Sequence, residues 1–268
     1  MDTIDRAVIG VTADRIAGRR ALHGGDLSNV TMLTLQGGDR IVAKTGPMVD
    51  REARMLSAMA DAGAPVPAVI GVSEGVLLLE ALDEGRADAT SWAATGHALR
   101  RLHDATGPGY GWDEDYSFGP VGILNAARDD WPDFWAANRI LVHAPHLPGG
   151  LAPRLANLAE ALPRLLPKTP RPALLHGDLW SGNLLFGAPP AVYFIDPACC
   201  WGDPEVDLAM LHLFGSPGAA FDESYGPLPP GWEERRAVYT LWPALVHLRL
   251  FGAGYRGMVD RLLTGLGV

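Results

Sequence analysis

Polar and apolar residues alternate along the first third of the chain in a way that predicts an antiparallel sheet. Residues 31–35 and 40–44 have this two-residue period and flank Gly37-Gly38, which is typical of a β-hairpin. Residues 22–30 lie between extended segments and contain paired glycines. The predicted order is therefore strand, glycine loop, strand, turn, strand.

A longer period, with apolar residues three or four positions apart, predicts helices elsewhere. We expect Ser91 to cap one of them and Pro243 to kink the last. A further helix should follow Asp203-Pro204, with Asp203 as its N-cap. The other predicted helices are residues 2–18, 49–62, 91–104, 151–166 and 233–263.

The apolar run 76–82 predicts a buried strand that ends at a polar break. In a chain of two lobes, this strand would lead into the hinge, where the backbone of Glu80, Ala81 and Leu82 would bind an adenine ring. An edge strand followed by a turn explains the composition equally well.

Short apolar segments in the second half of the chain frame a glycine-containing loop. Residues 173–175 predict a buried strand, and residues 184–186 and 191–195 predict a hairpin. A hairpin returns to the edge from which it started, so Asn183 at its beginning is expected beside Asp196 at its end.

Composition restricts the class of protein. The chain has 268 residues, 48% of them hydrophobic and 20% charged, which suits a globular protein with one large core or two smaller ones. The net charge of −9 and the lack of a basic run argue against nucleic acid as a partner.

Other partners and compartments are disfavoured by the same kind of evidence. The apolar runs are too short to span a bilayer, and the N-terminus lacks the order of a signal peptide. The adjacent Cys199 and Cys200 cannot staple distant segments. We expect a cytoplasmic monomer without a membrane partner.

The stretch from His176 to Asn183 carries the candidate chemistry. Asp178, an amide five residues later at Asn183, and a carboxylate thirteen residues beyond that at Asp196 suit phosphoryl transfer. One carboxylate can accept the proton of an attacking hydroxyl, and the other can hold Mg²⁺ together with the amide oxygen. Asp and Asn beside glycine are also common turn formers, so the loop alone leaves that alternative open.

A lysine and a glutamate occupy the positions that a kinase-like lobe requires. Lys44 ends the third predicted strand, and Glu52 lies one turn into the next helix. Such a lobe needs a lysine on the phosphates and a carboxylate that orients it. The alternative is a solvated helix charge, because Arg51 and Arg54 are also polar.

The glycine loop is a weaker signal. Gly24, Gly25 and Ser28 are the residues expected to approach the nucleotide, because they lie between two strands that precede Lys44. Paired glycines more often form a plain turn.

Asp207 lies among apolar residues of the helix that follows Pro204. A carboxylate there is costly without hydrogen-bond donors, so we predict that it accepts backbone N–H groups of residues 176–178. His97 and His103 have no ligand-like spacing and are expected to be packing or surface residues.

Two further segments allow more than one interpretation. Residues 106–125 have no sustained period, and loops of this length are usually functional or lids. Residues 130–135 combine an early Pro132 with three aromatic residues, which could line a sugar-sized pocket or anchor the core.

These motifs resemble the fructosamine kinase (ketosamine-3-kinase) family, a branch of the aminoglycoside-phosphotransferase-like kinases. The Trp180 form of the catalytic loop is the specific part of the resemblance. The resemblance covers nearly the whole chain, and it is carried by residues 176–183, 195–199, 202–210, 102–112, 130–135 and 245–252.

The resemblance implies an α+β, two-lobed, protein-kinase-like fold. Residues 1–82 would form a small antiparallel-sheet lobe with one orienting helix, and residues 83–268 a larger, mainly helical lobe. It also implies a kinase that uses ATP and Mg²⁺ to phosphorylate the 3-hydroxyl of a ketosamine, free or on a glycated lysine side chain. That reaction would repair glycated amines.

The resemblance also implies a role for individual residues. These are Asp178 as base, Asn183 and Asp196 as Mg²⁺ ligands, Lys44 held by Glu52 as phosphate ligand, Trp180 and Asp203 at the substrate, and His176 and Asp207 as structural residues.

Two departures from the family pattern concern loops. The loop Gly24-Gly25-Asp26 is short and lacks a cysteine, which removes support for thiol-based switching there. Residues 119–125 lack the glutamine often found between Pro120 and Asn125, so specificity can differ if this loop touches substrate.

Three alternatives stay open from the sequence. The same groups would serve phosphorylation of an aminoglycoside or of another small alcohol or sugar. A catalytically silent nucleotide-binding regulator is disfavoured because Lys44, Asp178, Asn183 and Asp196 are all present. A metal hydrolase would leave Lys44 unexplained.

Overall fold

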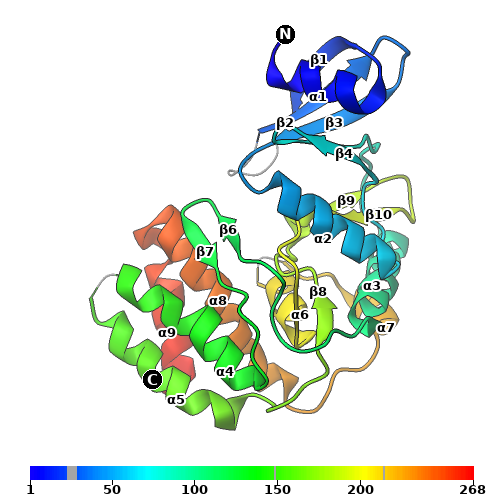
Figure 1. Ribbon diagram of the computed structural model, residues 1–268. Coiled ribbons are helices and arrows are strands. Elements are labelled where there is room, and N and C mark those ends of the chain that lie inside the picture. The colour runs from blue at the N-terminus through cyan, green and yellow to red at the C-terminus, as the bar shows by residue number, and fades with distance from the viewer. Residues whose placement is uncertain (23–28, 148, 214) are drawn as a thin grey trace.

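The computed structural model describes residues 1–22, 29–147, 149–213 and 215–268. A small sheet with α1 stands above a larger, mainly helical part, and α2 lies between them (Figure 1). The strands are β1 (Ile16–Leu22), β2 (Asn29–Leu35), β3 (Arg40–Thr45), β4 (Val69–Ser73), β5 (Val76–Glu80), β6 (Tyr116–Phe118), β7 (Val121–Ile123), β8 (Ala173–Leu175), β9 (Leu184–Phe186), β10 (Val192–Phe194) and β11 (Cys200–Gly202). The α-helices are α1 (Thr3–Thr12), α2 (Val49–Asp61), α3 (Ala89–Asp104), α4 (Trp131–Trp135), α5 (Leu151–Leu165), α6 (Glu205–Leu211), α7 (Ala219–Tyr225), α8 (Trp232–Phe251) and α9 (Arg256–Gly265).

The N-terminal sheet has the strand order β1-β2-β3-β5-β4, with antiparallel pairing between neighbours. Its two faces are covered by different helices. Ile41 and Ala43 of β3 pack in the cluster that includes α1, whereas Val42 packs in the cluster of α2. The two-residue period of a strand therefore directs Lys44, like Val42, to the side of α2.

The predicted hairpin of residues 31–35 and 40–44 is confirmed as β2 and β3, but the predicted first helix was too long. Instead of running to residue 18, α1 ends at Thr12, because Ala13 adopts a left-handed conformation with φ of 57°. The chain then enters β1 at Ile16.

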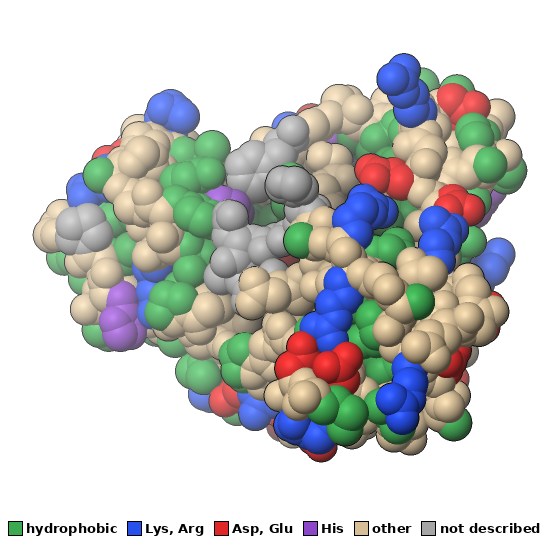
Figure 2. All heavy atoms as spheres, turned by 90° about the horizontal axis from the view of Figure 1, so that it is seen from above, with side chains coloured by type: hydrophobic (Ala, Val, Ile, Leu, Met, Phe, Trp, Pro, Cys, Tyr) green, Lys and Arg blue, Asp and Glu red, His purple; other side chains and the backbone are tan. Residues whose placement is uncertain are grey.

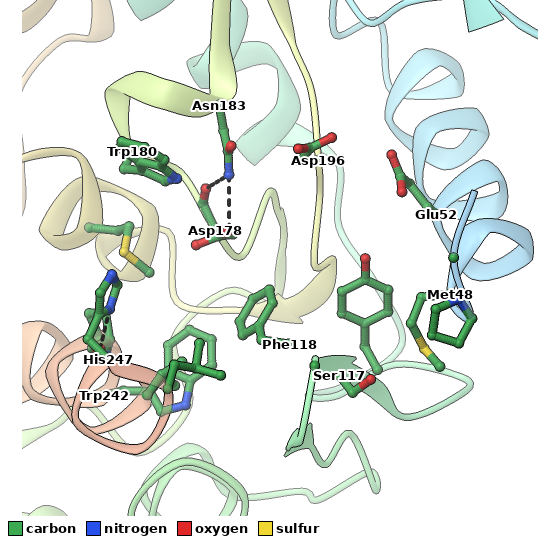
Figure 3. Close-up of a pocket in the computed structure, with 18 of the residues that line it drawn as sticks. Met48, Glu52, Ser117, Phe118, Asp178, Trp180, Asn183, Asp196, Trp242 and His247 are labelled. Carbon is green, nitrogen blue, oxygen red and sulfur yellow. Dashed lines mark hydrogen bonds between the residues drawn. The ribbon is translucent and has the colours of Figure 1, made fainter. Parts of the chain in front are cut away.

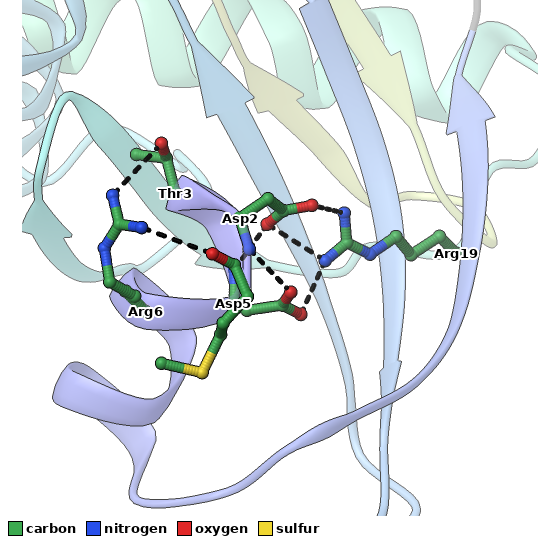
Figure 4. A network of polar contacts seen from close by, with 6 residues as sticks. Asp2, Thr3, Asp5, Arg6 and Arg19 are labelled. Carbon is green, nitrogen blue, oxygen red and sulfur yellow. Dashed lines mark hydrogen bonds and ion pairs between the residues drawn. The ribbon is translucent and has the colours of Figure 1, made fainter.

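A network of surface charges fixes the start of α1 to β1 (Figure 4). Asp2 and Asp5 form a reciprocal capping box, in which the side chain of each accepts the backbone N–H of the other. Arg19 of β1 then contacts both carboxylates at 2.6 Å.

In the C-terminal part, the aromatic segment forms core rather than pocket. Trp131, Phe134 and Trp135 are at most 1% exposed and pack in a cluster with α5, α8 and α9. Of the two interpretations of residues 130–135, the sugar-pocket one is therefore wrong.

Three antiparallel two-stranded ribbons complete the C-terminal part: β6–β7, β8–β11 and β9–β10. The β9–β10 pair confirms the hairpin predicted after the catalytic loop. The β6–β7 pair was not predicted and lies within residues 106–125, which were expected to be an irregular loop.

Helix boundaries correct two further predictions. Asp88 rather than Ser91 caps α3, because the Asp88 carboxylate accepts the Ser91 N–H at 2.9 Å. The helix predicted over residues 233–263 is interrupted at Gly252, whose φ is 81°: α8 continues through Pro243 to Phe251, and α9 begins at Arg256. The kink at Pro243 stays a prediction. The adjacent Cys199 and Cys200 are both buried and free.

Charged groups on the face seen from above are mixed in sign. Basic and acidic side chains are interspersed over the coloured atoms of Figure 2, which is consistent with the lack of a basic run in the sequence. Among the described residues, none of the helices combines the length and apolarity needed to cross a bilayer.

Candidate active site

A cavity of about 200 Å³ lies between the two parts of the chain. The five residues expected to carry phosphoryl transfer all line it: Lys44, Glu52, Asp178, Asn183 and Asp196. They come from β3, α2, the loop after β8, and the two ends of the β9–β10 hairpin. The structure therefore brings together residues that are up to 152 positions apart.

Lys44 bridges two carboxylates at one end of the cavity. Its Nζ lies 2.7 Å from Glu52 and 2.6 Å from Asp196, and these two acids face each other across the cleft (Figure 3). Burial lowers the pKa of Lys44, but the two carboxylates outweigh burial and the pKa is raised. Burial also raises the pKa of Glu52, against the effect of Lys44. The predicted Lys44–Glu52 pair is confirmed, and the lysine remains charged.

Asp178 occupies the floor of the cavity, and its carboxylate accepts a hydrogen bond from the Asn183 amide nitrogen at 3.0 Å. The same nitrogen donates to the Asp178 backbone carbonyl at 2.8 Å (Figure 3). Burial raises the pKa of Asp178 to about 7; the Asn183 hydrogen bond opposes this rise, and the charges of Asp196 and Asp207 add to it. An aspartate with this pKa suits a proton acceptor near neutral pH.

The β9–β10 hairpin places the two candidate metal ligands. The Ile195 N–H donates to the Asn183 carbonyl at 3.1 Å, which holds the two ends of the hairpin together. Asp196 follows in a left-handed conformation with φ of 56°, which is rare for a residue that carries a side chain.

The donor chemistry at this hairpin fits Mg²⁺. Because the Asn183 nitrogen is committed to Asp178, the amide oxygen remains for a cation, and Asp196 adds a carboxylate. Within the described ranges, no cluster of three or more His, Cys, Asp or Glu could hold a metal. Two protein oxygens, with phosphates and water, are typical of Mg²⁺ bound with a nucleotide.

Beneath the loop, Asp207 is fully buried and holds the backbone. It accepts the His176 N–H at 2.7 Å and the Gly177 N–H at 2.9 Å, so this prediction is confirmed. Gly177 has φ of 80°, and a Cβ there would lie 2.0 Å from the Ala198 carbonyl oxygen. Only glycine therefore fits between Asp207 and the neighbouring strand.

His103 also belongs to this buried network, which sequence reasoning missed. Its Nε2 lies 3.1 Å from Asp207, and its Nδ1 lies 2.9 Å from the Tyr225 hydroxyl. Of the two roles expected for it, packing or surface, the structure shows the buried one. Its partner in a different helix could not be read from spacing along the chain.

His176 connects the loop to the hairpin. Its Nε2 contacts the Ile195 carbonyl at 2.9 Å, and its Nδ1 accepts the Asp178 N–H at 3.2 Å. One neutral tautomer, with the proton on Nε2, satisfies both contacts, and burial lowers the pKa of His176. The side chain thus joins Asp178 to Ile195, the residue before Asp196, and these contacts fit the structural role expected of it.

The opposite wall of the cavity is mainly apolar. Trp180 is 40% exposed and lines the cavity, as do Trp242, His247 and Phe118 (Figure 3). A Cβ on Gly182 would lie 2.2 Å from the Trp180 ring, so the glycine lets the ring fold over the loop. Trp180 therefore forms an exposed part of the cavity wall.

Sequence reasoning did not identify the α8 wall, although a signal was present. Trp242, Val246 and Leu250 all line the cavity and are spaced four residues apart, which places them on one helix face. The β6–β7 hairpin contributes Tyr116 and Phe118 in the same way, at alternate positions of a strand.

The structure corrects the role predicted for Asp203. It was expected at the substrate, but it is 3% exposed and does not line the cavity. Its carboxylate accepts the Glu205 N–H at 3.0 Å and the Tyr239 hydroxyl at 2.8 Å. The N-cap of α6 is Pro204 rather than Asp203, but the Asp203 carboxylate binds the first N–H of α6 and ties that turn to α8.

Two parts of the expected nucleotide site are not settled by these contacts. Gly24, Gly25 and Ser28 lie outside the described residues. Glu80, Ala81 and Leu82 do not line this cavity, and the Glu80 N–H already donates to the Ala68 carbonyl at 2.9 Å. Adenine binding at the hinge stays a prediction, and it would use groups other than that N–H.

Comparison with known proteins places these features in one family. The fructosamine kinase family model matches residues 3–266. A probable ketoamine kinase of Synechocystis sp. is 36% identical, and the alignment covers 93% of this chain and 90% of that protein. The chloroplastic protein-ribulosamine 3-kinase of Oryza sativa subsp. indica is 29% identical, with 91% of this chain and 77% of that protein covered.

Solved structures agree with the sequence relatives. A Thermobifida fusca protein assigned as a fructosamine-3-kinase has a TM-score of 0.91 and 30% identity, covering 99% of this chain and 98% of that one. Small-molecule phosphotransferases that are 15–20% identical share the fold alone, with TM-scores of 0.59 to 0.68. The fold is therefore the two-lobed, protein-kinase-like one.

Proposed function

The chain belongs to the fructosamine kinase family, and on this premise we propose that it transfers the γ-phosphoryl group of ATP to the 3-hydroxyl of a ketosamine. Kinase activity and the use of ATP follow from the family. The position of the hydroxyl and the sugar, fructosamine or ribulosamine, belong to the proposal. The observation that carries it is Asp178, a carboxylate with a pKa raised to about 7 in the cavity that also contains Lys44.

In the proposed reaction, Asp178 accepts the proton of the sugar hydroxyl. The hydroxyl oxygen forms a bond to the γ-phosphorus, and the bond from that phosphorus to the bridging oxygen of ADP breaks. Asn183 holds the Asp178 carboxylate in place through its amide nitrogen. A positioned base of this kind contributes about 10²- to 10⁴-fold to the rate.

The opposite end of the cavity would bind the triphosphate. Lys44 is the cation for the phosphates, and Glu52 fixes its ammonium group. Asp196 and the Asn183 amide oxygen would hold Mg²⁺, which supplies positive charge against the phosphates. Before nucleotide binds, the Lys44 ammonium compensates the Asp196 charge.

The acceptor end suits an amine-bearing sugar. Asp178 is a carboxylate at this end, and the cavity as a whole is lined by three carboxylates, Glu52, Asp178 and Asp196, against Lys44. A ketosamine carries an ammonium group beside its sugar, and the face of Trp180 can contact such a cation. Because a 3-phosphate on a ketosamine decomposes and frees the amine, we propose repair of glycated amines as the role.

Turnover with defined acceptors tests the proposal. ATP consumption by the pure protein with Mg²⁺ would be compared for fructosyl-lysine, ribulosyl-lysine, kanamycin and fructose. We expect turnover with the two ketosamines only, and phosphate on the third carbon of the sugar. Turnover confined to kanamycin or fructose would exclude a ketosamine as the acceptor, but the chain would still be a kinase.

A further inference from the structure

Three charged residues join the two parts of the chain beside the cavity. Arg54 of α2 makes a two-pronged contact with Glu114, with Nε and Nη2 each 2.8 Å from a carboxylate oxygen. Arg51 of α2 places its Nε 3.0 Å from the same carboxylate, and its Nη1 donates to the Asp115 carbonyl at 2.5 Å. We call Arg51, Arg54 and Glu114 the interlobe clamp.

The clamp acts on the helix that carries Glu52. Residues three apart on a helix share a face, so Arg51 and Arg54 both point toward Glu114, while Glu52 on an adjoining face contacts Lys44. Met55 and Met59 of α2 also pack against the C-terminal part, and Met55 Sδ accepts the Cys199 N–H at 3.3 Å. The methionine packing is apolar and non-directional, and a bond to sulfur is weak, whereas a two-pronged Arg–carboxylate pair fixes the rotation of the helix.

On the other side, Glu114 is attached to a rigid base. The Asn125 amide nitrogen donates to the Glu114 carbonyl at 3.0 Å, and the Asn125 N–H donates to the Asp115 carboxylate at 2.7 Å. The Asn125 oxygen accepts from Arg139 Nη2 at 2.8 Å, and Arg139 is 1% exposed. A buried guanidinium therefore anchors the segment that presents Glu114.

The clamp also lies next to the acceptor end of the cavity. Glu114 comes two residues before Tyr116, the first residue of the β6–β7 hairpin that lines the cavity. Across the cavity, Met48 and Glu52 line the same space from the start of α2. The clamp thus joins the hairpin wall to the helix that orients the phosphate-binding lysine.

We propose that Glu114 is a positioning residue that keeps α2 docked, so that Glu52 holds Lys44 ready for the nucleotide. Loss of the clamp lets α2 turn or shift on its methionine contacts, and Lys44 then loses its fixed position. Since the same segment forms the acceptor wall, an acceptor that orders the β6–β7 hairpin also strengthens nucleotide binding. This coupling goes beyond the proposed reaction.

Binding of Mg²⁺ with AMP-PNP, measured by calorimetry, tests the proposal without an acceptor. We expect Glu114→Gln to weaken this binding about three- to tenfold, the usual size of coupling between sites, with a melting temperature within about 2 °C of the wild type because the clamp is partly exposed. The matched control is Glu74→Gln, which removes the Arg6–Glu74 pair, 2.6 Å long, inside the N-terminal part. The control should bind nucleotide like the wild type.

Unchanged nucleotide affinity in Glu114→Gln would overturn the proposal, and so would an equal loss in Glu74→Gln. A double-mutant cycle with Arg54→Ala and Glu114→Ala adds a second criterion. If the contact between Arg54 and Glu114 is what keeps α2 docked, the double variant binds nucleotide about as well as either single variant. Losses that multiply in the double variant would show that the two residues act separately, contrary to the proposal.

The coupling to the acceptor is measured with fructosyl-lysine and AMP-PNP together, and this step rests on the proposed function. We expect the acceptor to tighten nucleotide binding in the wild type and to have no effect in Glu114→Gln. An equal effect in both proteins would overturn the coupling. If the chain does not bind ketosamines at all, the nucleotide-only comparison still decides the role of Glu114.

Discussion

Asp178 and Asp207 are aspartates on opposite sides of the same loop, and their pKa values shift in opposite directions. Burial favours the neutral form of both. Asp207 offsets burial with His103 and with backbone N–H groups of residues 176 and 177, and its pKa is lowered. Asp178 has the Asn183 amide as its donor and faces the negative Asp196, so its pKa is raised to about 7. The number of donors, rather than the depth of burial, separates the pKa of the structural carboxylate from that of the proposed base.

This difference has opposite consequences for folding. Asp207 remains ionised in the folded chain, so it contributes stability above the pKa of an unfolded aspartate. Asp178 has a folded pKa above its unfolded value, so its ionisation costs stability as the pH rises toward 7. The chain thus carries one carboxylate that stabilises the loop and one that destabilises it, and the second is the proposed base.

The largest expected effect is on turnover. Asp178→Asn keeps the shape of the side chain and its contact with Asn183 but removes the proton acceptor. We expect kcat to fall about 10²- to 10⁴-fold, while nucleotide affinity measured by calorimetry changes less than about twofold because Lys44 and Asp196 are intact. Retained turnover would show that another group accepts the proton. Asp178 would then differ from Asp207 in its pKa but not through a catalytic role.

The second effect is on stability. Asp207→Asn removes the charge that accepts two backbone N–H groups and leaves a fully buried site with fewer acceptors. We expect a loss of about 2–4 kcal/mol in the free energy of unfolding, measured by urea denaturation. Asp178→Asn is the matched substitution on the other side of the loop and should show no such loss. Equal losses in both variants would mean that the two sides do not differ in role.

Much of this site could be predicted from the sequence, because several of its contacts follow from the pattern of residues in short segments. Hairpin topology alone predicted that Asn183 and Asp196 converge, and the cost of a lone carboxylate among apolar residues predicted that Asp207 binds the loop backbone. The positions of Lys44 at a strand end and of Glu52 one turn into the next helix, as a kinase-like lobe requires, likewise predicted their pairing. A short segment connects the partners in the first and third cases, whereas the Asp207 contact, across about 30 positions, followed from the cost of burying a lone carboxylate.

Other contacts depend on segments that only the folded chain brings together. His103 meets Asp207 across 104 positions, and Asp203 is turned toward Tyr239 rather than toward the substrate. Nothing in the aromatic run 130–135 distinguishes a pocket wall from a core, because both bury the same side chains. The end of α1 depended on Ala13, a residue with no intrinsic signal for a left-handed conformation.

The third expected effect is on the pH dependence of turnover, and it tests the proposed role of Asp178 as base. Because Asp178 must be ionised to accept a proton, we expect kcat/KM to rise with pH and to level off above a pKa of about 7. Below that pKa the rate should fall about tenfold per pH unit. The measurement is the initial rate between pH 5.5 and 9 with saturating Mg²⁺. An acid limb centred near the ordinary aspartate pKa of about 4 would show that burial does not control this group.

The smallest expected effect is the pH dependence of stability, and it tests both carboxylates at once. Since the folded pKa of Asp178 exceeds the unfolded one, wild type and Asp178→Asn should be equally stable near pH 4 and differ most above pH 7, with the variant more stable. We expect a difference of about 1–2 kcal/mol, less than the full shift implies, because the carboxylate is partly open to solvent. That corresponds to about 2–8 °C in melting temperature.

Asp207→Asn should give the opposite dependence. The lowered pKa of Asp207 confers stability above the unfolded value, so this variant should differ least from the wild type in acid and most at neutral pH, with the variant less stable. Thermal melts of the three proteins from pH 4 to pH 8 provide both curves. Differences that open in opposite directions would establish that hydrogen-bond donors on one side of the loop set the two roles. Parallel curves would mean that burial alone governs both residues, and the high pKa of Asp178 would then reveal nothing about catalysis.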